Sequence, residues 1–199
     1  MDLEFFFDVG SPYSYLASTQ LAGLSERTGV HVRWRPFLLG GVFKASGNEM
    51  PARVAAKAKW MLDDLTRLGE HFGVPFRMNS HFPVNTLSAM RAIVAAGRVY
   101  GEQAIEPLGR SMFDGMWVED RNLADGDEVA FCIGRVQGLE IKRLAAEVSS
   151  QATKDALRDA TDEAVRRGAF GAPTFFLGDV MYWGHDRLPL IEAELGKRG

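Results

Sequence analysis

The sequence contains a single cysteine, Cys132, among its 199 residues. One cysteine cannot form an internal disulfide, and secreted domains commonly carry cysteine pairs, so we expect a cytoplasmic protein. No stretch approaches the roughly 18 consecutive apolar residues of a membrane-spanning helix, so we expect no membrane partner. The opening sequence MDLEFFFDVG has acids and no basic residue, which does not fit a secretory signal peptide.

Other patterns are missing as well. The net charge is -3 and no basic stripe is visible, so we expect no nucleic-acid partner. A glycine-rich G-x-G-x-x-G motif does not follow the first predicted strand, and there is no P-loop, so nucleotide cofactors are not indicated. The four histidines lack the spacing of metal ligands, so we expect no metal. Hydrophobic residues make up 46% of the chain, which is enough for one core with a large insertion.

The chain begins with a strand, a helix and a second strand. The apolar run at 3–8 predicts a buried strand, and 31–36 predicts another that ends at Pro36. Between them, Ser11 is a natural N-cap, with Pro12 at the first helical position and Gly29 as the stop. This order is typical of a βαβ unit with parallel strands.

The middle of the chain is helical in pattern, and its end returns to strands. The predicted helices cover 51–72, 86–100, 102–116, 126–136, 140–149 and 153–167. Two short β runs flank Gly178-Asp179, a hairpin signal, and a last helix follows. We therefore predict an α/β fold of thioredoxin-like type, interrupted by a large all-helical insertion. The predicted boundaries are 1–45 and 168–199 for the discontinuous thioredoxin-like domain, and 46–167 for the inserted helical domain.

The segment Ser11-Pro12-Tyr13-Ser14 is the first candidate site. It stands where a thioredoxin-like redox enzyme would carry Cys-x-x-Cys. The positive end of the helix dipole and its unpaired N–H groups stabilise a nearby anion. Without a cysteine of its own, such a site can stabilise only the thiolate of a ligand. The alternative is that Ser11 is simply a helix cap.

Two later segments offer binding groups. A cis peptide bond before Pro173 would leave the backbone of Ala172 free to pair with an extended, peptide-like ligand; the alternative is a trans proline in an ordinary turn. In Trp183-Gly184-His185-Asp186-Arg187, backbone N–H groups could hold a carboxylate, while Asp186 could pair with an ammonium group. The alternative there is a capping aspartate without a ligand.

These motifs carry a family resemblance. The stretches FFFDVGSPYSYLA, RPFLLGGVFKASGN, KAKWMLDDLTRLGEHFGVPF, FPVNTLSAMRA and RRGAFGAPTFFLGDVMYWGHDRL cover most of the chain. In these stretches the chain resembles the 2-hydroxychromene-2-carboxylate isomerases, which are relatives of the kappa-class glutathione transferases. The resemblance implies a thioredoxin-like fold with an inserted helical domain, glutathione as cofactor, and a homodimer.

The resemblance also implies roles for particular residues. Ser11 takes the place of the catalytic serine. The implied glutathione contacts, besides Ser11, are Asn48, Lys57, Ala172, Pro173, Trp183, Gly184, His185 and Asp186. His185 departs from the asparagine or serine that the family pattern leads us to expect, which puts a side-chain contact there in doubt but not the backbone contacts.

The implied reaction belongs to aromatic hydrocarbon catabolism. It interconverts 2-hydroxychromene-2-carboxylate and trans-o-hydroxybenzylidenepyruvate by reversible addition of a thiolate, which permits rotation about a carbon–carbon double bond. In this scheme the Ser11 hydroxyl donates a hydrogen bond to the sulfur and does not itself attack. Asn48 and Asn85 are expected to orient the polar groups of the small aromatic substrate. An apolar wall is expected from Phe37 and Trp60, with Tyr15, Phe43, Phe82 and Trp117 as further candidates.

Three other functions remain open at this point. A kappa-type transferase would consume glutathione by conjugating it to an electrophile. A serine hydrolase would use Ser11, His185 and Asp186, but the chain lacks the G-x-S-x-G motif and the acid is adjacent to the histidine. An inert binding protein of the same fold is the last alternative. Cys132 lies in an apolar helical stretch and is expected to be a buried structural thiol.

Overall fold

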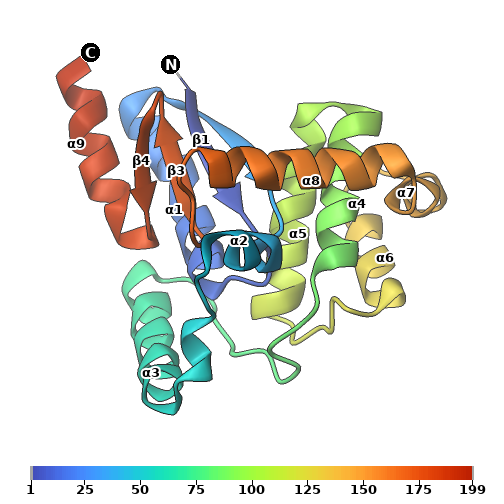
Figure 1. Ribbon diagram of the computed structural model, residues 1–199, viewed down its shortest axis with the longest axis horizontal. Helices are drawn as coiled ribbons and strands as arrows, with labels where there is room; N and C mark the ends of the chain where they lie inside the picture. Colours follow the sequence, from blue (N-terminus) through green and yellow to red (C-terminus); the bar gives the residue numbers. More distant parts are fainter. Residues whose placement is uncertain (1, 199) are drawn as a thin grey trace.

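A computed structural model describes residues 2–198, and it has a four-stranded sheet with helices on both faces (Figure 1). The strand order is β2-β1-β3-β4; β1 and β2 are parallel, and β3 is antiparallel to both β1 and β4. The strands are β1 (Asp2–Phe7), β2 (His31–Pro36), β3 (Thr174–Leu177) and β4 (Val180–Trp183). The α-helices are α1 (Pro12–Thr28), α2 (Leu39–Ser46), α3 (Ala55–Phe72), α4 (Leu87–Tyr100), α5 (Ile105–Trp117), α6 (Gly126–Gly134), α7 (Ile141–Val148), α8 (Gln151–Arg166) and α9 (Leu188–Arg198), with short 3-10 turns η1 (Pro51–Arg53), η2 (Glu102–Ala104) and η3 (His185–Arg187).

The phenylalanines of β1 explain why both faces of the sheet are covered. Successive side chains of a strand point to opposite faces. Phe5 and Phe7 enter a large core that includes α1, α4, α5 and α9, whereas Phe6 enters a smaller core with Phe37 and with Phe176 of β3. All three β1 rings are fully buried, so the first strand is apolar on both sides. The predicted α/β architecture is confirmed.

The start of α1 is fixed by local chemistry. The Ser11 backbone is extended, its hydroxyl accepts a hydrogen bond from the Ser14 amide at 3.1 Å, and Pro12 occupies the first turn. Gly29 ends the helix in the left-handed conformation, with a φ of 70° that glycine adopts without steric cost. The predicted cap residues are therefore confirmed at both ends.

The predicted pattern of the remaining elements is largely confirmed. Between β2 and β3, every regular element of the described chain is helical, and β3 and β4 form the predicted hairpin around Gly178-Asp179. The sequence analysis missed α2, because Gly40 and Gly41 in its first turn disfavour a helix by intrinsic propensity. The proposed domain boundaries stay a prediction. Residues from both segments, such as Phe7 and Met112, share the same large core.

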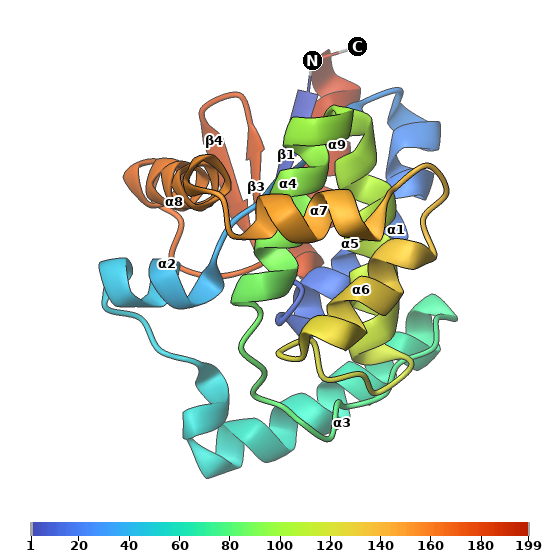
Figure 2. The ribbon, with the colours of Figure 1, turned by 90° about the vertical axis from the view of Figure 1, so that its right-hand side faces the viewer.

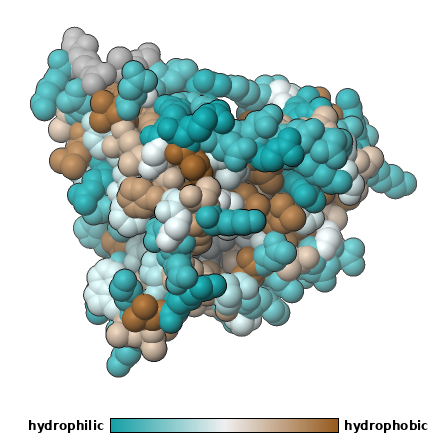
Figure 3. All heavy atoms as spheres, in the orientation of Figure 1, coloured by the Kyte–Doolittle hydropathy of each residue, from teal (hydrophilic) through white to brown (hydrophobic). Residues whose placement is uncertain are grey.

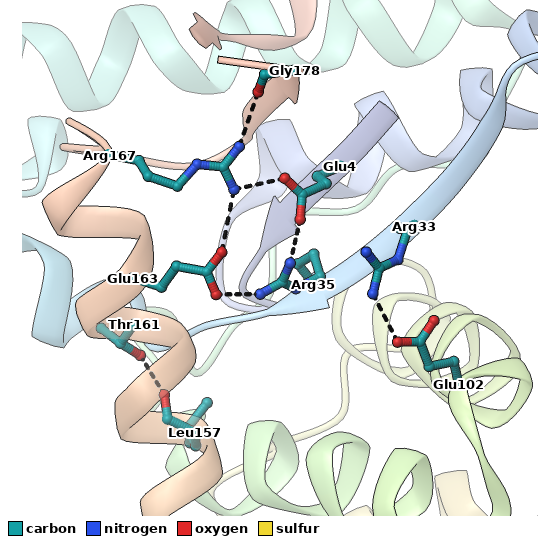
Figure 4. A network of polar contacts seen from close by, with 9 residues as sticks. All are labelled: Glu4, Arg33, Arg35, Glu102, Leu157, Thr161, Glu163, Arg167 and Gly178. Carbon is teal, nitrogen blue, oxygen red and sulfur yellow. Dashed lines mark hydrogen bonds and ion pairs between the residues drawn. The ribbon is translucent and has the colours of Figure 1, made fainter. Parts of the chain in front are cut away.

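Alternating charges join α8 to the face of the sheet on which Phe6 and Phe176 lie (Figure 4). Arg35 of β2 bridges Glu4 of β1 and Glu163 of α8. Arg167, just after α8, pairs with Glu4 at 2.6 Å, and its guanidinium carbon lies 3.8 Å from the centre of the Phe176 ring. Because these groups are mostly shielded from solvent and share partners, they stabilise the packing more than isolated surface ion pairs do.

Replacing Arg167 by methionine tests this network. We expect the free energy of unfolding to fall by about 2 kcal/mol, because Glu4 and Glu163 each lose a partner and the cation–π contact is lost. Arg158→Met is the matched control, since that arginine is largely exposed and pairs within its own helix. Urea denaturation of both variants measures the difference. Equal losses in the two variants would contradict a special role for the network.

The face of the molecule in Figure 3 is hydrophilic over α8, and apolar residues are visible below that helix. Figures 1 and 2 show α3 standing off from the sheet at one end of the molecule. Within residues 2–198, every helix is too short or too polar to cross a lipid bilayer.

Candidate functional site

The centre of the candidate site is the Ser11 hydroxyl at the start of α1. Ser11 is 4% exposed, and its Oγ atom accepts a hydrogen bond from the Ser14 amide. The hydroxyl donates to the Ala172 carbonyl, with an Oγ–O distance of 3.3 Å. This bond is longer than a typical O–H···O bond, so the hydroxyl proton is held weakly. It can turn toward a ligand at modest cost.

The carbonyl that faces Ser11 belongs to the loop before β3. The Ala172–Pro173 peptide bond is cis, as predicted, and the Pro173 carbonyl accepts a hydrogen bond from the Gly184 amide at 3.0 Å. The strand pairing of β3 begins only at Thr174, so Ala172 lies outside the sheet ladder. The loop before β3, the start of α1 and the turn after β4 therefore meet at one place.

A cavity of about 510 Å³ opens at this meeting point. Its walls come from the start of α1, from α3, from the loop before β3 and from η3. It brings together the residues that the sequence analysis assigned to glutathione: Ser11, Asn48, Lys57, Ala172, Pro173, Trp183, Gly184, His185 and Asp186. That these residues bind glutathione stays a prediction. Trp60, Phe43 and Phe82 line the same cavity.

Asn48 holds the rim of the cavity together. Its Nδ2 atom donates to the Phe170 carbonyl at 2.8 Å, and its Oδ1 atom accepts from the Glu49 amide. The side chain thus ties the segment after α2 to the loop before β3. Phe170 in turn packs against the Trp183 ring, with 4.8 Å between ring centres. Asn48 therefore positions two walls of the cavity, in addition to any ligand contact.

His185 forms an aromatic stack in the wall. Its ring lies parallel to Tyr13, with 5.1 Å between centres, and Tyr13 donates to the Asp64 carboxylate of α3 at 3.0 Å. Burial lowers the pKa of His185, more strongly than Asp186 and Asp64 raise it. The imidazole is therefore neutral at neutral pH. The Tyr13–Asp64 bond fastens α3 to the start of α1.

Four of the proposed substrate residues do not reach the cavity. Phe37 is fully buried against Phe6, so its assignment to the substrate wall is wrong. Tyr15 donates to the Pro75 carbonyl and Trp117 to the Val9 carbonyl, so both are core residues. Asn85 points elsewhere: its Oδ1 atom accepts from the Leu87 amide at the start of α4. Spacing within the sequence did not reveal which faces pack inward.

The structure adds a residue that the sequence analysis missed. Asp8 directly follows β1 and is buried, and its carboxylate accepts hydrogen bonds from the Gly10 amide, the Leu39 amide and the Thr86 hydroxyl. It thus joins the loop that carries Ser11 to the starts of α2 and α4. Burial raises the pKa of Asp8, more strongly than the three hydrogen bonds lower it. An acid at the end of an apolar strand was the available signal.

The hydrolase alternative does not fit this geometry. The Ser11 hydroxyl contacts Ala172 and Ser14, and within residues 2–198 it makes no hydrogen bond to His185. The Asp186 carboxylate pairs with Arg187 at 3.5 Å. The described residues also contain no cluster of three or more potential metal ligands.

Cys132 is remote from this site. It is fully buried on α6, and burial raises the pKa of its thiol to about 11. At neutral pH it is therefore a protonated core residue, as predicted, and no protein thiolate is available.

Comparisons with known proteins agree with this architecture. Residues 2–196 match the model of the DSBA-like thioredoxin domain. The chain is 32% identical over 195 residues to the 2-hydroxychromene-2-carboxylate isomerase of Sphingobium xenophagum, and the match covers 97% of each chain. It is 29% identical over 207 residues to glutathione S-transferase kappa 1 of Rattus norvegicus, covering 98% of this chain and 91% of the relative.

A solved structure agrees as well. A 2-hydroxychromene-2-carboxylate isomerase has a TM-score of 0.86 at 27% identity, covering 99% of this chain and 95% of the other. The chain therefore belongs to the DSBA-like thioredoxin domain family, in the group that contains the 2-hydroxychromene-2-carboxylate isomerases and the kappa-class glutathione transferases.

Proposed function

We propose that this protein is a glutathione-dependent isomerase that interconverts 2-hydroxychromene-2-carboxylate and trans-o-hydroxybenzylidenepyruvate, or close analogues. One observation carries the proposal: a weakly held serine hydroxyl stands at the start of α1, opposite the Ala172 carbonyl, on the wall of a cavity. A donor at a helix N-terminus suits a ligand thiolate. The named activities of the relatives support the same class of reaction.

The charges around the cavity suit glutathione, which has two carboxylates, one ammonium group and a thiol. Lys57 lines the cavity and can meet a carboxylate. The Asp186–Arg187 pair, at 3.5 Å and half-exposed, is weak enough to exchange for the ammonium group and a carboxylate of the ligand. Asp64 also lines the cavity and accepts the Tyr13 hydroxyl. The backbone at Ala172 lies outside the sheet ladder and suits the extended peptide part. Charged residues of both signs, contributed by α3 and by η3, favour a zwitterionic tripeptide over a simple thiol.

The chain contributes activation and orientation. Glutathione, when bound, supplies a thiolate that adds reversibly to a conjugated double bond and so permits rotation about it. The Ser11 hydroxyl donates a hydrogen bond to the sulfur position, and the dipole of α1 favours negative charge there. Both effects lower the pKa of a thiol that would otherwise be near 8.5. Trp60 and Phe82 offer apolar surface for an aromatic substrate.

A transferase is the second candidate. Similarity to a kappa-class glutathione transferase over 98% of this chain favours it. Both functions need the same activated thiol. They differ in whether glutathione is regenerated.

The deciding experiment follows isomerisation at increasing glutathione concentrations, with a parallel assay of free thiol. We expect the rate to saturate with glutathione, while the thiol concentration stays constant over many turnovers. If thiol disappears one-for-one with substrate, the transferase is correct. Equal rates in thiol-free buffer would eliminate both glutathione functions.

Replacing Cys132 by alanine checks that the reactive thiol is external. We expect unchanged turnover, because the pKa of this thiol is about 11 and its side chain is buried on α6. The free energy of unfolding should fall by about 1 kcal/mol through the small cavity that is created. Steady-state kinetics and thermal unfolding measure both quantities. A large loss of turnover at undiminished stability would mean that Cys132 takes part in the reaction.

A further inference from the structure

A second cavity opens beside the first. Its volume is about 540 Å³, and it is formed by α2, the segment after α2, and residues 82–86 before α4. The two cavities adjoin and share six lining residues: Gly10, Leu39, Phe43, Asn48, Met50 and Phe82. Gly10 directly precedes Ser11, so a ligand in the second cavity lies next to the position at which a thiol would be activated.

The second cavity combines apolar walls with positive charge. Phe43 and Phe82 are partly exposed, as suits rings that meet a ligand. Two cations, Lys44 and Arg53, also line the cavity. Neither residue lines the first cavity.

The balance of charge in this cavity favours an anion. The Asp8 carboxylate is already satisfied by three donors. Glu49 is paired with Arg53 at 3.1 Å, and both side chains are about two-thirds exposed, so the pair is weak and easily exchanged. The Lys44 ammonium group has no hydrogen bond or ion pair within residues 2–198. The group that lacks a partner is therefore a cation.

We propose that the second cavity binds the acceptor substrate, a conjugated aromatic 2-oxo acid, with Lys44 and Arg53 attracting its carboxylate and Phe43 and Phe82 flanking its conjugated system. This inference rests on the proposed function, because the acceptor must reach the thiol activated at Ser11. In this proposal Lys44 and Arg53 take over the orienting role that the sequence analysis gave to Asn85, which does not line either cavity.

Binding of an unreactive analogue tests the proposal separately from catalysis. The probe is 4-phenyl-2-oxobutanoate, which lacks the double bond to which a thiolate adds; its methyl ester lacks the charge. Calorimetric titration gives the Kd of each with the wild-type chain, Lys44→Met, Arg53→Met and the double variant. Lys59→Met is the matched control, since Lys59 is an exposed lysine of α3 that lines neither cavity. Titration with glutathione is run on the same proteins.

The expected pattern is specific to the carboxylate. Each single variant should weaken binding of the acid about two- to fivefold, which is the range of partly exposed ion pairs, and the double variant about tenfold. The ester should bind equally to all variants, the Lys59→Met protein should match the wild type, and the Kd for glutathione should be unchanged. Undetectable binding of the acid to the wild type, or equal weakening of acid and ester, would overturn the proposal. If the acid binds as described and glutathione does not, the proposed function fails while the carboxylate site stands.

Discussion

Replacing Ser11 by alanine is expected to raise the pKa of the bound glutathione thiol by about one to two units and to lower turnover near neutral pH by about 10- to 100-fold. The reason is the loss of a hydrogen bond to a charged sulfur, which contributes about 1.5–3 kcal/mol. The helix dipole remains, so some activation should persist. The thiolate absorbance of bound glutathione, followed against pH, measures the shift directly.

Ser14→Ala is the matched control for this experiment. Ser14 belongs to the same four-residue motif and is fully buried, but its hydroxyl has no hydrogen-bond partner among residues 2–198. The substitution keeps the backbone amide of residue 14, which donates a hydrogen bond to the Ser11 hydroxyl. Ser11→Ala also removes the N-cap of α1, at a cost of about 1 kcal/mol, so stability is measured alongside. An unchanged thiol pKa in Ser11→Ala would remove this hydroxyl from the mechanism.

The Asp8→Asn variant should be destabilised by about 3 kcal/mol, corresponding to a fall in Tm of roughly 6–12 °C for a chain of this size. An asparagine keeps one side-chain oxygen and has an NH₂ group in place of the other. In one orientation this NH₂ group would face the Leu39 amide, and in the other it would face the Gly10 amide and the Thr86 hydroxyl, so a donor would meet a donor in either case. Because Asp8 joins the loop carrying Ser11 to α2 and α4, turnover should fall as well. Urea denaturation and steady-state kinetics measure the two effects.

Thr86→Val provides a graded comparison, since it removes one of the three donors and should cost about 1 kcal/mol. The pH dependence gives a second check. Burial raises the pKa of Asp8 in the folded state, so its ionisation opposes folding, and its contribution to stability falls as pH rises through that pKa. The difference between wild type and Asp8→Asn should therefore be larger at pH 4 than at pH 7. A difference that does not change with pH would contradict the raised pKa.

The features that the sequence determined by itself are local ones. The N-cap at Ser11, the stop at Gly29 and the turn at Gly178-Asp179 depend on residues only a few positions apart. Their hydrogen bonds and backbone angles are set by neighbours along the chain. The helical periodicity of the middle segment is local in the same sense. These signals were sufficient to predict the order of the strands and of every α-helix except α2, and to place the candidate thiol site at the start of α1.

Tertiary structure decided the features that depend on packing between distant segments. Phe37 and Phe43 look alike in the sequence, but Phe37 packs against Phe6 in the core, and Phe43 lines both cavities. The three donors to Asp8 come from different parts of the chain, the most distant 78 positions away. Burial and hydrogen-bond pairing at such places depend on which surfaces meet when the chain folds. A single sequence does not specify those contacts residue by residue, because many pairings of apolar faces have similar hydrophobic free energy until the whole core is packed.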